Sequence, residues 1–206
     1  MKTSRWLTTS AQVAVALALL ALFVKTADEV VEDEWSAVDR SLLLAMHRLA
    51  SPAADLIMRT LTFIGSGFGL IPLALVAGLW CIRRGQARLA FWLWGVAAVT
   101  ELLDLALKLA FARVRPSLWP DVLHLATYSF PSGHAMSSAA TLGMIAVVIA
   151  RLAPRWRVVA AVVTPLVVVG IGLSRIYLGV HWPSDVLGGW AAGSLMLLLG
   201  AVLSSR

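Results

Sequence analysis

The sequence predicts an all-α protein: a bundle of six transmembrane helices that forms a single domain, residues 1–206. Hydrophobic residues make up 60% of the chain and charged residues only 14%, which is outside the usual range of soluble domains. Apolar runs also recur along nearly the whole sequence. Because one membrane span needs about 20 residues, six spans with short connections leave no room for a second domain.

The first apolar run, residues 11–24, follows Lys2 and Arg5. This pattern fits either a cleaved signal peptide or a retained first span. We favour the retained span, because residues 25–27 place a lysine where a signal peptidase requires a small residue. The acidic residues 28–34 that follow are expected to form a solvated loop.

A short helix is expected next. Ser36 and Asp39 have the spacing of a capping box, in which two side chains satisfy the first free N–H groups of a helix. Apolar residues then recur at helical spacing through Leu49. We expect an amphipathic helix that lies on the outer leaflet of the membrane.

Five further spans are expected at residues 60–82, 90–109, 134–150, 158–173 and 184–203. Pro72 lies inside the first of these and is tolerated where neighbouring helices pack around it. Residues 65–69 are rich in glycine, but no strand–helix unit surrounds them, so we expect close helix packing rather than phosphate binding. Gly189 and Gly193 have the spacing that allows two helices to approach closely. Cys81 lies in an apolar stretch and is expected to be buried and unreactive.

The basic residues indicate the orientation. The connections on one side of the predicted bundle contain no acidic residue and carry nine basic ones: Lys2, Arg5, Arg83, Arg84, Arg88, Arg151, Arg155, Arg157 and Arg206. By the positive-inside rule this side is cytoplasmic, and so are both termini of a chain in the cell (inner) membrane. The net charge of +6 therefore reflects topology, and no nucleic-acid partner is expected because no aromatic-studded basic stripe is present.

The third span carries ionisable residues on one helical face, namely Glu101, Asp104 and Lys108. Such groups are costly inside a membrane and normally face a polar interior, so we expect them to line a cavity. The alternative is an Asp104–Lys108 ion pair that only helps the span to insert.

Residues 174–185 place a cation, an imidazole and a carboxylate between two apolar runs. Pro183 suits the first turn of a helix, which puts His181 and Asp185 about one turn apart. The carboxylate can then fix the tautomer of the imidazole and leave its second nitrogen free to attack an electrophile, while Arg175 offers a planar fork for phosphate oxygens. In the alternative interpretation, Asp185 merely caps the helix and His181 is an ordinary interfacial residue.

Three polar segments lie at the outer ends of the predicted spans. Residues 108–116 have the pattern K-x6-RP, residues 131–134 read PSGH, and residues 174–185 have the pattern SR-x5-H-x3-D. In this order, and without a substitution, they resemble the motifs of the type 2 phosphatidic acid phosphatase family, which are integral membrane lipid phosphatases related to vanadium haloperoxidases. Through these motifs the resemblance covers roughly residues 100 to 190.

The resemblance implies hydrolysis of a membrane lipid phosphate or diphosphate on the periplasmic or extracellular side, through a phosphohistidine intermediate. His181 would attack phosphorus while Asp185 holds its ring, and His134 would donate a proton to the departing group. Five residues would bind the phosphate: the cations Lys108, Arg115 and Arg175, with Ser132 and the Gly133 N–H as neutral donors.

Undecaprenyl diphosphate is the expected substrate, because outward-facing members of the family commonly recycle that carrier. Phosphatidylglycerophosphate, phosphatidic acid and lipid A phosphates are alternatives, and so is transfer of the phosphate to an acceptor other than water. A non-catalytic phospholipid-binding protein is a further alternative, although anion binding needs only the cations and not His134, His181 and Asp185. No metal or other cofactor is expected, because the three cations would repel a divalent ion. His47 and His124 match no motif and are expected at the surface.

Overall fold

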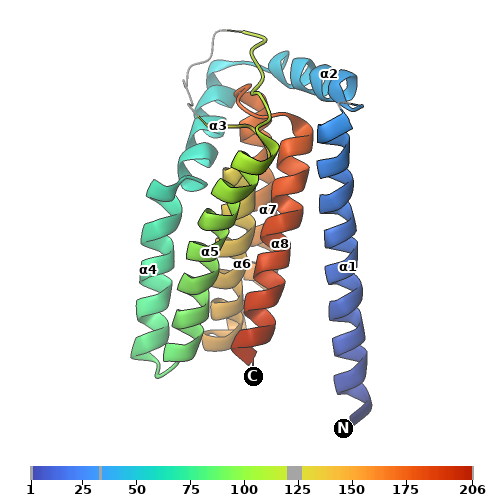
Figure 1. Cartoon of the computed structure of the whole chain (residues 1–206). Helices are drawn as coiled ribbons and strands as arrows, with labels where there is room; N and C mark the ends of the chain where they lie inside the picture. The colour runs from blue at the N-terminus through green and yellow to red at the C-terminus, as the bar shows by residue number, and fades with distance from the viewer. Residues whose placement is uncertain (1, 33, 120–126, 206) are drawn as a thin grey trace.

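The computed structural model describes residues 2–32, 34–119 and 127–205, with side chains from Ser10 onward. In these residues the chain is helical and contains no strand (Figure 1). The α-helices are α1 (Lys2–Glu32), α2 (Ser36–His47), α3 (Pro52–Ile64), α4 (Gly67–Arg83), α5 (Ala87–Phe111), α6 (Gly133–Leu152), α7 (Arg157–Tyr177) and α8 (Pro183–Ser205), with a short 3-10 helix, η1 (Pro154–Trp156), before α7.

The predicted multi-pass helical bundle is confirmed. Five described segments are long and apolar enough to cross a membrane, and α3 and α4 taken together as a bent pair meet the same criterion. Both ends of the chain and the α4–α5 and α6–α7 connections lie at the same end of the bundle (Figure 1). The basic residues 83–88 and 151–157 are therefore gathered at one end, as the charge pattern indicated.

The second span is not the continuous helix that we predicted for residues 60–82. It breaks at Gly65 and Ser66, and α3 and α4 meet there at a bend of 50°. Glycine is unfavourable in the interior of a helix. The Ser66 hydroxyl also donates to the Phe63 carbonyl at 2.7 Å, and such a local side-chain bond offers the backbone an alternative to continuing the helix. A Cβ at Gly65 would lie 2.3 Å from Ile171 Cγ2, so the expected close packing does occur at this glycine.

Two other local predictions were wrong. Residues 28–32 belong to α1 rather than to a loop, and a Lys25–Glu29 ion pair of 2.8 Å, one helical turn apart, stabilises this end of the helix. Ser36 and Asp39 form no capping box either, because α2 has no side-chain cap and Asp39 is buried against other elements.

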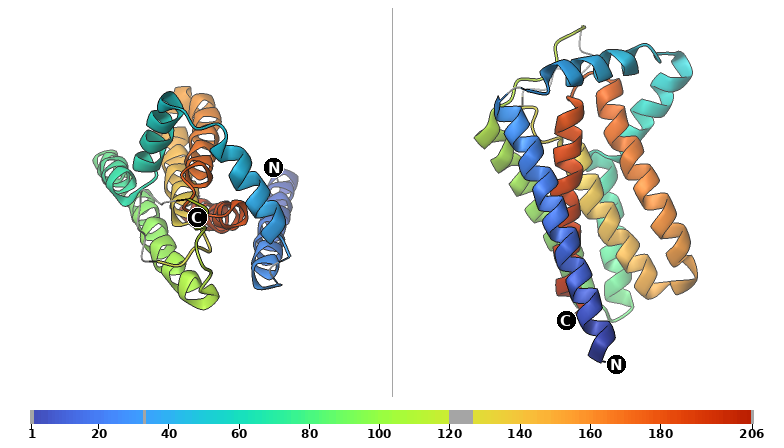
Figure 2. Two further views of the ribbon diagram at one scale, coloured as in Figure 1. Left: turned by 90° about the horizontal axis from the view of Figure 1, so that it is seen from above. Right: turned by 90° about the vertical axis from the view of Figure 1, so that its right-hand side faces the viewer.

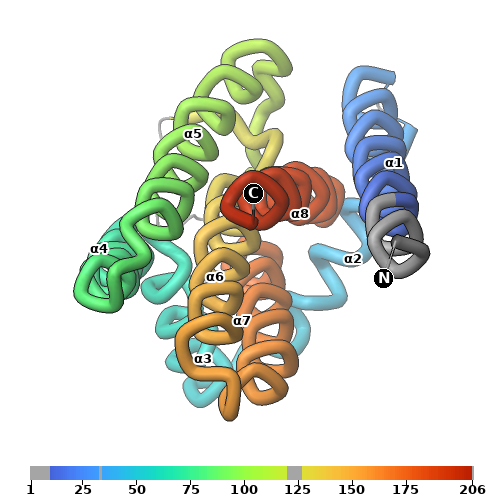
Figure 3. Tube along the Cα trace, turned by 90° about the horizontal axis from the view of Figure 1, so that it is seen from below, coloured from blue at the N-terminus to red at the C-terminus, as the bar shows by residue number. Residues whose placement is uncertain are grey.

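Helices α6 and α8 form the centre of the bundle (Figure 3). A Cβ at Gly189 would lie 2.6 Å from the Ser132 carbonyl oxygen, and one at Gly193 would lie 2.2 Å from that of Met136, so both glycines allow the predicted close approach. Helix α1 packs on α8, and α4 and α5 pack together on the other side of α6. Cys81 is fully buried in the core that α4, α5 and α6 share.

The short helix α2 lies across the end of the bundle at which α7 joins α8 (Figure 2). It buries Asp39 and Leu43 against these helices, while the apolar side chains of Val38 and Leu42 on its other face remain exposed. This is the amphipathic helix that the sequence predicted. Its buried face lies beside the first residues of α8.

Candidate active site

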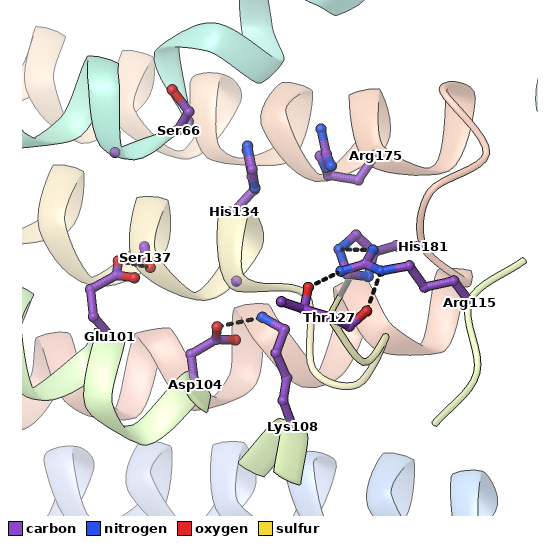
Figure 4. A pocket seen from close by; sticks show the side chains of 13 residues that line it. Ser66, Glu101, Asp104, Lys108, Arg115, Thr127, His134, Ser137, Arg175 and His181 are labelled. Carbon is purple, nitrogen blue, oxygen red and sulfur yellow. Dashed lines mark hydrogen bonds and ion pairs between the residues drawn. The ribbon is translucent and has the colours of Figure 1, made fainter. Parts of the chain in front are cut away.

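A polar cavity of about 190 Å³ opens at the end of the bundle opposite the two termini (Figure 4). All three predicted polar segments contribute to its lining, together with the bend between α3 and α4. His181 and Arg115 lie at one end of the cavity, and Glu101 with Ser137 lies at the other. The packing of α5, α6 and α7 thus brings Lys108 and His181, which are 73 positions apart (181 − 108), to one cavity.

The three predicted cations, Lys108, Arg115 and Arg175, all line this cavity. Arg175 is 1% exposed and lies in the last turn of α7, which extends to Tyr177 and thus beyond the predicted end of this span at residue 173. Its Nη1 donates to Thr62 Oγ1 on α3 at 3.3 Å. Three positive side chains around one small cavity can bind the oxygens of a phosphate group.

Lys108 shares the cavity with two carboxylates of its own helix. It forms a buried ion pair with Asp104, while Glu101 accepts a hydrogen bond from Ser137 at 2.5 Å. The ion pair of the alternative interpretation and the cavity-facing stripe are therefore both present. Gly133 lies against the pair, since a Cβ at this position would be 2.9 Å from Asp104 Oδ2.

Arg115 is held in place by the loop that precedes α6 and by the connection between α7 and α8. Its guanidinium donates to the carbonyl of Thr127 at 2.7 Å, to that of Val180 at 2.6 Å and to that of Tyr128 at 3.1 Å. One of the same nitrogens, Nη1, lies 3.1 Å from His181 Nε2. Because a guanidinium can only donate, Nε2 is the acceptor and carries no proton. The proton of a neutral His181 ring is then on Nδ1.

The other ring nitrogen of His181, Nδ1, faces Asp185 Oδ2 at 3.4 Å. Burial, together with the nearby cations Arg115 and Arg175, lowers the pKa of His181 to about 3, although Asp185 opposes the shift. The imidazole is therefore neutral at physiological pH. Its Nε2 carries no proton and accepts from Arg115 beside the cavity, and an unprotonated ring nitrogen is what a nucleophile requires.

Asp185 also caps helix α8. The helix begins at Pro183, as predicted, and the Trp182 N–H donates to Asp185 Oδ2 at 2.8 Å. The capping role and the contact with His181 thus coexist on one carboxylate.

Four residues around Asp185 were not recognised in the sequence. Arg113 Nη1 donates to Asp185 Oδ1 at 2.5 Å, and the Ser129 hydroxyl donates to Oδ2. Asp39 accepts a hydrogen bond from Nη2 of Arg113 at 2.8 Å. The Ser184 hydroxyl accepts from Nη1 at 2.8 Å and donates to Asp39. The sequence could have indicated Arg113, because it is a charged residue within the K-x6-RP segment. No sequence pattern pointed to Asp39 as a site residue, since its spacing suggested only a capping box.

The remaining predicted site residues lie at the start of α6. His134 and Gly133 line the cavity, and Ser132 is buried next to them with a hydroxyl that has no hydrogen-bond partner among the described residues. Of the two histidines outside the motifs, His47 is exposed and stacks on Trp119 at 4.0 Å, and His124 lies outside the described residues.

The chain is similar to known proteins in both sequence and fold. A family model described as the PAP2 superfamily matches residues 87–206. Phosphatidylglycerophosphatase B of Bacillus subtilis (strain 168) is 32% identical over 168 residues, which cover 79% of this chain and 81% of the relative. An undecaprenyl-diphosphatase of Sulfolobus acidocaldarius is 32% identical over 103 residues, 48% of this chain and 47% of the relative.

A solved structure is similar along almost the whole chain. The crystal structure of a transmembrane PAP2 type phosphatidylglycerolphosphate phosphatase from Bacillus subtilis superposes with a TM-score of 0.84 at 28% identity. The match covers 90% of this chain and 93% of the other.

Proposed function

This chain belongs to the PAP2 superfamily and is a multi-pass membrane lipid phosphatase, and from that premise we propose that His181 is its nucleophile and His134 its general acid. The observation that carries the proposal is the shared cavity: both histidines line it with Lys108, Arg115 and Arg175. Phosphoryl transfer needs the charge of the phosphate oxygens to be held while a nucleophile attacks in line.

In the first step, His181 Nε2 attacks phosphorus and the bond from phosphorus to the lipid oxygen breaks. His134 gives its proton to that oxygen, so the lipid leaves with a neutral hydroxyl group in place of the phosphate. The product is a phosphohistidine. The Ser132 hydroxyl, which has no hydrogen-bond partner within the part of the chain that the structure describes, and the Gly133 N–H at the start of α6 are available as neutral donors to the phosphate oxygens.

In the second step, water attacks phosphorus and the bond to Nε2 breaks. His134 takes the proton of the attacking water, which returns it to its starting state as inorganic phosphate is released. Asp185 keeps the proton of the His181 ring on Nδ1 throughout, because its Oδ2 faces that nitrogen.

For the substrate, we place a phosphate monoester of a glycerolipid first, with phosphatidylglycerophosphate as the leading candidate. Asp104 and Glu101 line the deeper part of the cavity, where they would repel a second phosphate attached directly to the first. Phosphatidylglycerophosphatase B of Bacillus subtilis, whose match covers 79% of this chain, is named for that monoester. Undecaprenyl diphosphate, the substrate expected from the sequence, is the second candidate and is favoured by the presence of three cations.

We place the cavity on the periplasmic or extracellular side. The support is its position at the end of the bundle opposite the basic connections, which the positive-inside rule assigns to the cytoplasm.

The test is phosphate release by the purified protein from phosphatidylglycerophosphate, phosphatidic acid and undecaprenyl diphosphate at matched detergent content. His181→Ala should abolish release and should prevent labelling of the protein by a ³²P-substrate, whereas the surface variant His47→Ala should behave as wild type. His134→Ala should lose activity on lipids. On p-nitrophenyl phosphate, whose leaving group needs no proton, it should still release a burst of p-nitrophenol and form the phosphohistidine, and then turn over slowly because the second step lacks its base. Full turnover by His181→Ala would refute the proposed nucleophile.

A further inference from the structure

Arg113 bridges two buried carboxylates from different parts of the chain. Its Nη1 lies 2.5 Å from Asp185 Oδ1 on α8, and its Nη2 lies 2.8 Å from Asp39 Oδ2 on α2. Asp185 is 0% exposed and Asp39 is 2% exposed, and the arginine side chain retains only 12% of its exposure. These charges are therefore screened little by water, and their balance matters to the groups beside them.

The group formed by Arg113, Asp39 and Asp185 has a net charge of one negative unit. One guanidinium and two carboxylates sum to −1, whereas Arg113 with Asp185 alone would sum to zero. The excess charge lies next to His181, whose Nδ1 faces the other oxygen of Asp185. The cations Arg115 and Arg175, and His134 across the cavity, also face the His181 ring and disfavour positive charge on it.

The contacts of Asp39 fix it in this place. Its Oδ1 accepts from the Ser184 N–H at 2.9 Å, and its Oδ2 accepts from the Ser184 hydroxyl as well as from Arg113. The Ser184 N–H is one of the free donors in the first turn of α8, so α2 provides a cap for the helix that carries Asp185. Asp39 lies outside residues 87–206, the part of the chain that the family model matches.

We infer that Asp39 is a positioning residue of the phosphatase site: it takes up the charge of Arg113, so that Asp185 keeps its own charge for His181. The inference rests on the proposed role of His181 as nucleophile. When Nε2 bonds to phosphorus, the ring becomes positively charged and Nδ1–H becomes a stronger donor. A carboxylate already neutralised by Arg113 would stabilise that ring less well.

The first test is Asp39→Asn, which removes the charge and keeps the shape. We expect kcat for phosphate release to fall by roughly 10- to 100-fold, as is typical when the partner of an orienting group is lost. Glu34→Gln is the matched control, because it removes a carboxylate from an exposed position two residues before α2 begins and should leave kcat unchanged.

A double-mutant cycle with Arg113→Gln separates charge balance from simple support of the fold. Without the guanidinium there is no charge for Asp39 to take up, so Asp39→Asn should cost little in the Arg113→Gln background. An equal loss of kcat in both backgrounds would overturn the inference. The comparison of Arg113→Gln with the double variant remains decisive if Asp39→Asn alone folds poorly.

A second readout does not depend on turnover. In ¹⁵N-histidine NMR spectra of the resting protein, the Nδ1 proton of His181 should move upfield in Asp39→Asn, because its hydrogen bond to Asp185 weakens. An unchanged resonance together with unchanged kcat would also overturn the inference. Failure of the proposed function would look different, since wild type itself would then release no phosphate.

Discussion

The replacement of Asp185 by asparagine tests the geometry of the site most directly, because neither orientation of the amide fits. Donors face both oxygens of the carboxylate: Arg113 Nη1 faces Oδ1 at 2.5 Å, and the Trp182 N–H faces Oδ2 at 2.8 Å. If the NH₂ group of the asparagine takes the position of Oδ1, its donors face the donors of the Arg113 guanidinium. If it takes the position of Oδ2, it faces the Trp182 N–H and favours the wrong tautomer of His181.

The expected magnitude follows from burial. Asp185 is fully buried, so Asp185→Asn leaves the charge of Arg113 less well compensated at this site, and removal of one partner of a buried pair costs about 3–5 kcal/mol. Asp39 still pairs with Arg113, which places the expected loss near the lower end of that range, about 3 kcal/mol. Because the wrong His181 tautomer cannot attack, kcat should fall by about 10³- to 10⁴-fold.

Two assays measure these losses: unfolding of the detergent-solubilised variant by titration with SDS, and phosphate release under saturating substrate. Asp104→Asn is a useful comparison, because it also removes a carboxylate from an ion pair but does not contact His181. If Asp185→Asn unfolded within about 1 kcal/mol of wild type and kept kcat within tenfold, the role assigned to this carboxylate would be refuted.

Three further predictions follow from other parts of the structure. Because burial lowers the pKa of His181 to about 3, the neutral nucleophile persists down to acidic pH. In a bell-shaped kcat/KM profile corrected for ionisation of the substrate, the acid limb should therefore lie well below pH 5, and activity should be lost as pH falls through about 3. An acid limb near pH 6.5 would contradict this. Gly193→Ala should destabilise the bundle by about 1–3 kcal/mol in the same SDS titration, because its Cβ would lie 2.2 Å from the Met136 carbonyl oxygen, while Gly95→Ala, with nothing within 4 Å, should not. Activity should persist in excess chelator and be inhibited by vanadate; loss on chelation and recovery with magnesium would show that the mechanism needs a metal.

Local patterns in the sequence were sufficient for much of this protein. Apolar runs predicted where the membrane-spanning helices lie, and the basic residues predicted which connections lie at the same end of the bundle. Pro183 indicated the start of the helix that carries Asp185. Helical geometry is local, so the four-residue spacing of His181 and Asp185 already indicated that the two side chains face each other. The same reasoning put Lys108 and Asp104 on one face of α5.

The break at Gly65 and Ser66 was missed because a long apolar run looks the same whether the helix continues or bends. Here the bend depends on local bonds of Ser66 and on the close fit of Gly65 against Ile171 of α7, and it brings Ser66 to the cavity. The partners of Asp39 were missed for a related reason. Its contact with Ser184 joins residues 145 positions apart, and no local periodicity reports such a pairing.

The sequence by itself therefore predicted the cations and histidines that line the cavity, because motif spacing and membrane spans are properties of short stretches of chain. Only the tertiary structure decided the charge state of the groups around His181. Which carboxylate balances Arg113, and how much negative charge remains on Asp185, depend on how α2, α8 and the segment after α5 pack together. Electrostatic interactions between buried groups act through space, so they become defined only when these elements are assembled.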